Sequence, residues 1–228
     1  MRMPRLLVLA PLALASPASA AGIDLAWDAC LGDLGSSSNK VFACDRNTGI
    51  ETLWATFESP FTGAITGTTG IVEVDIEFHT LSAIPLPVWW DFEDLASCRV
   101  GAIDADSTSG TPSCRPWTTS KAPTFVFDRI DFQLPTPDVG RIVVSTRTAG
   151  AVVTGQRYLA CRLQLYHLRS IGVGACAGCS EPVRITLTAI NVAGHIMTQP
   201  VTQNFVNWQS GPTATRRTTW GAVKALYH

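Results

Sequence analysis

The sequence predicts an all-β protein, a single antiparallel β-sandwich of the jelly-roll kind that is cross-linked by disulfides. Three observations indicate this fold. Apolar and polar residues alternate with a period of two in several segments, which is typical of strands with one buried and one solvated face. Clusters of Gly, Pro, Ser and Thr separate these segments, as turns between antiparallel strands require. Seven cysteines in a chain of 228 residues favour disulfides.

The first 20 residues have the pattern of a secretory signal peptide. Arg2 and Arg5 form a positively charged start, residues 6–15 form an apolar core, and residues 18–20 match an A-x-A cleavage site. The apolar run is shorter than the roughly 20 residues that a membrane-spanning helix needs, and no later stretch reaches that length. We therefore expect 1–20 to be removed and 21–228 to form the mature protein, in the periplasm or outside the cell.

The expected mature chain is nearly neutral. Loss of Arg2 and Arg5 leaves 15 basic and 18 acidic residues, without a basic stripe. Because nucleic acids are bound through clustered Lys and Arg, we expect no nucleic acid partner. No repeat or linker divides residues 21–228, so we expect one domain.

Four segments show the alternation most clearly: 71–79, 140–148, 158–167 and 182–190. Their expected core-facing residues include Val72, Val74, Ile76, Phe78, Leu159, Cys161, Leu163, Leu165, Val183, Ile185 and Leu187. The tail, where Trp220, Val223 and Leu226 recur at helical spacing, fits a short C-terminal helix or a last strand equally well.

The polar face of segment 71–79 carries Glu73, Asp75 and Glu77. The stretch EVDIEF resembles the E-x-D-x-E strand signature of the laminarinase and lichenase group of retaining glycoside hydrolases, which are jelly-roll sandwiches. The resemblance implies Glu73 as nucleophile, Glu77 as acid/base and Asp75 as the carboxylate that tunes them. Residues i and i+4 on one strand face bring two carboxyl groups near the separation that retention requires. The match covers six residues, however, and a solvated strand face carries alternating acids equally well. We expect a solvated face and keep catalysis as the alternative.

The segment PLPVWWDF places Trp89 and Trp90 side by side in the sequence. Adjacent side chains on a strand point to opposite faces, so one ring would be exposed and could stack on a sugar. In the other interpretation, one ring fills the core and the other covers an edge. The pair is the candidate ligand surface, with carbohydrate or another surface protein as partner.

An exported chain uses its cysteines mainly for disulfides. The candidates are Cys30, Cys44, Cys98, Cys114, Cys161, Cys176 and Cys179. Cys30 lies close in sequence to Cys44, Cys98 to Cys114, and Cys161 to the last two, so loops of about 15 residues are available, but the sequence leaves the connectivity open. Each loop would stabilise the fold by roughly 3 kcal/mol. The odd count leaves one thiol unpaired.

Cys176 and Cys179 stand in C-x-x-C spacing within VGACAGCSEPV. Zinc would need two further ligands, for which Cys161, His167 and His195 are available, but no second C-x-x-C or H-x-x-x-H exists. A redox dithiol normally opens a helix, whereas this one lies in a Gly/Pro turn between expected strands. We therefore expect structural disulfides, with no metal and no cofactor.

Five segments resemble a group of exported bacterial proteins with no established activity: IDLAWDAC, VWWDF, ACAGCSEPV, NFVNWQSG and RRTTWGAVKALYH. The resemblance runs from near Ala21 to His228 and is most specific in the C-x-x-C turn and in TWGAVKALY. It implies a single domain and assigns no catalytic residue. Members of the group often have cysteines where this chain has Arg184 and Gly211, which implies that those two were partners and that the other pairs are intact.

Together these observations predict an exported, non-catalytic β-sandwich that binds an unidentified ligand or interacts with a surface partner. The alternatives are a retaining glycoside hydrolase that uses Glu73 and Glu77, and a structural subunit of a surface assembly.

Overall fold

The computed structural model describes residues 21–66, 71–82, 85–92, 97–119, 123–130, 139–147 and 149–210. The all-β prediction is confirmed, since the described residues contain strands and a single 3₁₀ turn, η1. The elements are β1 (Gly22–Trp27), β2 (Asn39–Lys40), β3 (Ile50–Glu58), β4 (Gly63–Ile65), β5 (Ile71–Thr80), η1 (Val88–Trp90), β6 (Ile103–Asp106), β7 (Arg115–Pro116), β8 (Pro123–Ile130), β9 (Val139–Arg147), β10 (Gly150–Val152), β11 (Arg157–Tyr166), β12 (Val183–Val192), β13 (His195–Met197) and β14 (Phe205–Trp208). The predicted C-terminal helix or strand lies outside the described residues.

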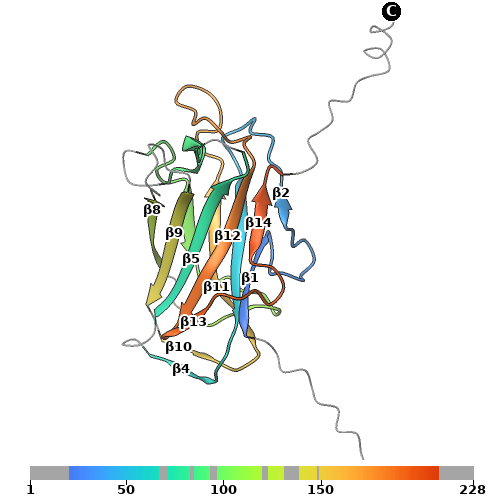
Figure 1. The fold of residues 1–228 in the computed structure, drawn as a ribbon, viewed down its shortest axis with the longest axis vertical. Coiled ribbons are helices and arrows are strands. Elements are labelled where there is room, and N and C mark those ends of the chain that lie inside the picture. The colour runs from blue at the N-terminus through green and yellow to red at the C-terminus, as the bar shows by residue number, and fades with distance from the viewer. Residues whose placement is uncertain are drawn as a thin grey trace, which may run out of the picture.

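The strands form two sheets packed face to face, with a short β4–β10 ribbon at one end (Figure 1). The front sheet has the order β2-β14-β12-β5-β9-β8, with β13 on β12. The back sheet has the order β1-β3-β11-β6, with β7 on β11. All pairs are antiparallel except the two-residue pairs β2–β14 and β7–β11. The chain passes from the back sheet to the front sheet between β3 and β5, and again between β11 and β12. In the back sheet β3 pairs with β11, and in the front sheet β5 pairs with β12. Jelly-roll sandwiches have this ribbon-like pairing.

The core lies between the two sheets and follows the predicted alternation. In β5, Val72, Val74, Ile76 and Phe78 are buried, while the residues between them are partly exposed. The inward residues of β3, β9, β11 and β12 belong to the same cluster. Burial of one apolar face per sheet is what makes the two layers stable together.

One predicted core residue, Leu159, faces the other way. The pairing of β11 with β3 shifts between Leu159 and Cys161, which is the mark of a β-bulge. The bulge turns Leu159 to the outside of the back sheet, where it forms a second buried cluster with Cys30, Trp54 and Cys114. The two residues that follow, Ala160 and Cys161, both lie in the main core, Cys161 as predicted.

Strand β1 is hydrogen-bonded on both edges. It pairs with β3 along its whole length, and the amides of Ile23 and Leu25 donate to the carbonyls of Gln199 and Gln203 on the other side. All six residues of β1 are buried. The segment directly after the predicted cleavage site is therefore an interior strand of the sandwich.

Candidate functional site

All seven cysteines lie in the described residues, and six of them form disulfides: Cys30–Cys114, Cys44–Cys179 and Cys98–Cys176. The connectivity, which the spacing left open, does not join the sequence neighbours Cys30 and Cys44 or Cys98 and Cys114. The bonded cysteines are 78 to 135 residues apart, because each bond joins loops that meet only once the sandwich has folded. Cys161, a disulfide candidate, is instead an unbonded thiol in the core. Burial, with a smaller contribution from the negative charge of Asp106, raises the pKa of Cys161 to about 12.

The C-x-x-C motif is a double cross-link. Cys176 is bonded to Cys98, with Cα atoms 5.8 Å apart, and Cys179 to Cys44, with Cα atoms 6.0 Å apart. The two cysteines thus fasten one turn to two distant loops and are not bonded to each other. The described residues contain no cluster of three or more His, Cys, Asp or Glu side chains placed to hold a metal ion.

The residue before Cys179 is Gly178, and the local geometry requires a glycine there. Its φ is +95°, and a Cβ at this position would lie 2.1 Å from Cβ of Pro87. The amide of Trp89 also donates to the carbonyl of Ala177 at 3.0 Å. The C-x-x-C turn therefore packs directly on the 85–90 segment, and only glycine permits this approach.

The prediction of a Trp89–Trp90 ligand platform is wrong. The two residues lie in η1, which begins after Pro87, and both rings are fully buried. A 3₁₀ turn does not alternate faces as a strand does, so both side chains turn inward. Trp89 stacks on Trp208 with ring centroids 5.1 Å apart, and Trp90 packs edge-on against the same ring at 5.5 Å.

A buried arginine completes this aromatic cluster. Arg99 is fully buried, with its guanidinium carbon 3.7 Å from the centroid of the Trp89 ring. Its Nη2 donates to the carbonyl of Tyr166 at 2.6 Å, whereas Nε and Nη1 have no hydrogen-bond partner among the described residues. Burial lowers the pKa of Arg99. This arginine cross-links the region from inside and is not available to a ligand.

The loop between β11 and β12 exposes aliphatic side chains above this cluster. We call residues 168–180 the tip loop; it protrudes at the upper end of the sandwich in Figure 1. Leu168, Ile171 and Val173 are exposed, and Val173 is fully so. Beside the loop, Val88 is exposed next to an open pocket of about 390 Å³. The pocket is lined by Pro85, Leu86, Pro87, Val88, Ala177, Gly178 and Glu181.

The tip loop is held in one conformation from several sides. Asn47 accepts hydrogen bonds through Oδ1 from the amides of Ser170 and Ile171, and its Nδ2 donates to the carbonyl of Ile171. Arg169 donates to the carbonyl of Cys98 at 2.8 Å. With the two disulfides, these bonds present the exposed aliphatic residues on a fixed support, which lowers the entropy lost on binding.

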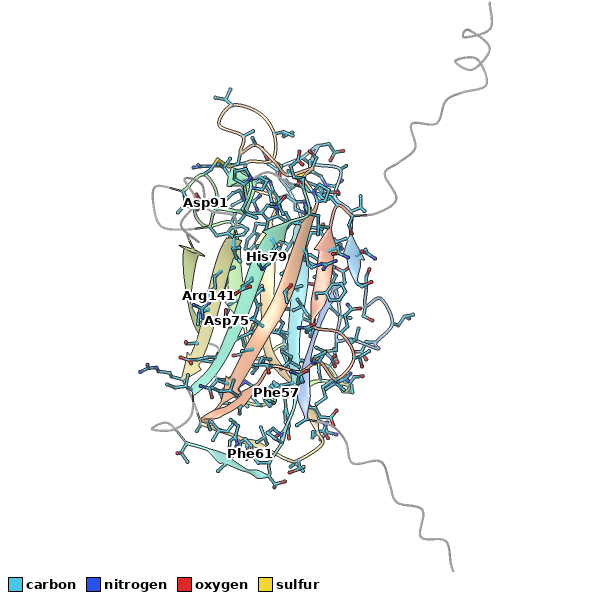
Figure 2. All side chains as sticks on the ribbon, in the orientation of Figure 1. Phe57, Phe61, Asp75, His79, Asp91 and Arg141 are labelled. Atoms are coloured by element: carbon cyan, nitrogen blue, oxygen red, sulfur yellow. A yellow bond between two sulfur atoms is a disulfide. The ribbon has the colours of Figure 1, made fainter. Side chains whose placement is uncertain are left out.

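A second pocket lies at the opposite end of the molecule. It has a volume of about 460 Å³ and is lined by Ala21, Pro60, Gly194, His195, Ile196, Met197, Thr198 and Gln199. Phe61, labelled at the lower end in Figure 2, stacks on His195 with ring centroids 4.4 Å apart. Ile196 is the one large aliphatic residue in this pocket lining that is exposed, and none of the lining residues forms a disulfide.

The three predicted carboxylates lie on the outer face of β5 and are bound to neighbours. Asp75 forms a two-point ion pair with Arg141 of β9; both residues are labelled in Figure 2. Glu77 contacts His79 at 2.9 Å on the same strand, and Glu73 accepts a hydrogen bond from Ser145 at 3.5 Å. These contacts are those of a solvated sheet face with paired charges.

Nothing in the described part of this face forms the Trp-lined groove that the glycoside hydrolase hypothesis requires. The six tryptophans of the described residues are all buried, and Trp220 lies outside them. The residues opposite Glu77 on the neighbouring strands are Thr186 and Arg141. The described residues therefore form no Trp-lined sugar-binding cleft around Glu73 and Glu77.

Sequence reasoning missed the tip loop. The available signal was SIGVGAC, in which Ile171 and Val173 stand next to glycines in a turn and have no strand face on which to be buried.

Within the described part of the chain, no helix is long and apolar enough to cross a membrane. Comparison with known proteins finds no matching family model, no matching curated protein and no matching solved structure.

Proposed function

We propose that this chain is an exported, non-catalytic β-sandwich, of the bacterial group that its segments resemble, which binds another surface protein through the tip loop. Export is supported by the leader pattern of residues 1–20 and by three disulfides, which form and persist in oxidising compartments.

The observation that carries the proposal is the rigid exposure of aliphatic side chains. Leu168, Ile171 and Val173 are exposed within one short loop, and two disulfides hold the loop that carries them. Exposed apolar groups clustered at one end of a molecule mark an interaction site.

The chemistry of the tip favours a protein over a carbohydrate. Sugars are bound by exposed aromatic rings together with planar polar groups. The tip loop contains no aromatic residue, and the nearby rings of Trp89, Trp90 and Trp208 are buried. An apolar groove or a hydrophobic side chain of another protein complements aliphatic groups better.

Photo-cross-linking in the producing cells tests the proposal. A benzophenone side chain replaces Val173 in one variant and Ile196, an exposed residue at the other end, in a control variant. We expect a discrete protein adduct from position 173 only, which disappears when Ile171 and Leu168 are also changed to Ser. Identical adducts from both positions, or none, would contradict the proposal. An adduct between two copies of the chain would instead favour a structural subunit of an assembly.

A further inference from the structure

His167 lies at the base of the tip loop, directly after β11, and its side chain is almost fully buried. Its Nδ1 is 2.9 Å from the carbonyl oxygen of Thr48, and its Nε2 is 2.9 Å from Oε1 of Glu51. A backbone carbonyl and an ionised carboxylate accept hydrogen bonds and never donate them. Both ring nitrogens must therefore carry a proton to satisfy these contacts, and the side chain is then an imidazolium.

The surrounding charges agree with this protonation state. Glu51 also pairs with Lys40 at 2.5 Å, and Lys40 pairs with Asp28 at 2.8 Å. Burial alone would lower the pKa of Lys40, but its hydrogen bonds to Asp28 and Glu51 raise it, so Lys40 stays charged beside Glu51. The carboxylates of Asp28 and Glu51 thus face the ammonium of Lys40 and the imidazolium of His167.

The other groups around His167 are aromatic or cationic. The ring stacks on Phe42 with centroids 3.6 Å apart, a contact that suits a cation over an aromatic face. Arg46 lies 5.7 Å from the centroid of that same ring. Arg99 donates a hydrogen bond to the carbonyl of Tyr166, and Arg169 donates one to the carbonyl of Cys98. Among the described charged groups, Glu51 is the one whose side chain accepts a hydrogen bond from the His167 ring.

The same short segment, 47–51, also holds the tip loop. The amide of His167 donates to the carbonyl of Gly49, and Asn47 accepts from the amides of Ser170 and Ile171. Loss of a proton from His167 would set a nitrogen lone pair against an oxygen lone pair inside this contact. A buried acceptor without a donor is costly, so segment 47–51 and the tip loop would separate more easily.

We infer that doubly protonated His167, which donates from Nδ1 to Thr48 and from Nε2 to Glu51, fastens the tip loop to the sandwich and makes the tip surface sensitive to the protonation state of this ring. The inference rests on the proposed function only for its consequence for binding. Its direction follows from the geometry: only a ring with protons on both nitrogens donates to both acceptors, and a neutral ring loses one of the two hydrogen bonds.

Nuclear magnetic resonance of the mature, oxidised protein tests this without any partner. At pH 6 both ring nitrogens of His167 should be protonated. The amide-exchange protection of Ser170 and Ile171, corrected for the intrinsic rate, should fall about tenfold once His167 is neutral. His79, with a side chain 39% exposed and Nε2 2.9 Å from Glu77, serves as the internal control for a histidine beside a carboxylate at the surface.

A ring nitrogen without a proton at pH 6, or protection of Ser170 and Ile171 that does not change across the titration, would overturn the inference. In His167→Gln, which carries no ionisable group, the protection should be independent of pH. Because these readouts need no binding partner, a negative cross-linking result at Val173 would overturn the proposed function and leave this inference standing.

Discussion

Nη2 of Arg157 in β11 lies 3.1 Å from Oδ2 of Asp24 in β1, across the intervening strand β3. Asp24 is 1% exposed, and its Oδ1 accepts hydrogen bonds from the amides of Thr202 and Gln203. One carboxylate therefore fastens the 199–203 segment to the back sheet. Arg157 additionally donates to the carbonyl of Leu31, so the pair orders two loops at once.

Asp24→Asn should lower the free energy of unfolding by about 2 kcal/mol, because it leaves the partly buried Arg157 without its counter-charge. Asp28→Asn is the matched control: this carboxylate is 37% exposed and pairs with Lys40, so its loss should cost less than about 1 kcal/mol. Urea unfolding of both variants measures the difference. Equal losses would show that the Asp24–Arg157 pair has no special weight.

The disulfides at the tip should each contribute strongly to stability. Replacing Cys98 and Cys176 together by Ala, or Cys44 and Cys179 together by Ala, opens a loop of 78 or 135 residues. The chain-entropy account gives a loss of about 4 to 5 kcal/mol for loops of this size. Denaturant unfolding measures it, with Cys161→Ala as the control that removes a cysteine but no bond. A loss no larger than in the control would contradict the prediction.

The strands and their inward faces could be predicted from the sequence because alternation is a local property. Every second residue of β5 from Val72 to Phe78, and of β12 from Val183 to Leu187, faces the core as expected. The bulge that turns Leu159 outward leaves no trace in the alternation, since it arises from pairing with β3.

The cross-links and the tryptophan pair could not be predicted from local spacing. Cys44 meets Cys179 only because the folded sandwich brings the two loops together at one end. Adjacent tryptophans on a strand would point to opposite faces, but a 3₁₀ turn after Pro87 packs both Trp89 and Trp90 against Trp208. Long-range packing decided both outcomes.

Cys161 should be unreactive in the folded protein. Burial raises its pKa to about 12 from an ordinary value of 9.0, so almost no thiolate is present at pH 8. Iodoacetamide should modify no cysteine in the native state and one per chain after unfolding without reductant. Since the unfolded thiol ionises above pH 9 and the folded one does not, this group should lower stability by about 1.4 kcal/mol per pH unit between pH 9 and 12. Rapid native labelling would show that the core around Cys161 opens.

Trp89→Ala should destabilise the fold rather than remove a ligand contact. The ring is fully buried between Trp208 and Arg99, so its loss should cost about 3 to 5 kcal/mol. Val88→Ala, in the same 3₁₀ turn but exposed, should cost less than about 0.5 kcal/mol. Thermal and urea unfolding compare the two variants. A Trp89 variant of normal stability would mean that the ring is not part of the core.

The carboxylate face of β5 should contribute a little stability and no catalysis. Asp75 and Arg141 are partly exposed, with side chains 21% and 38% accessible, so Asp75→Asn should cost less than about 1 kcal/mol, and less still in high salt. The wild-type protein should release no reducing ends from mixed-linkage or β-1,3-glucans, and Glu73→Gln and Glu77→Gln should leave that result unchanged. Release of reducing ends that either substitution abolishes would establish a glycoside hydrolase, because two carboxylates four residues apart on one strand would then be acting as nucleophile and acid.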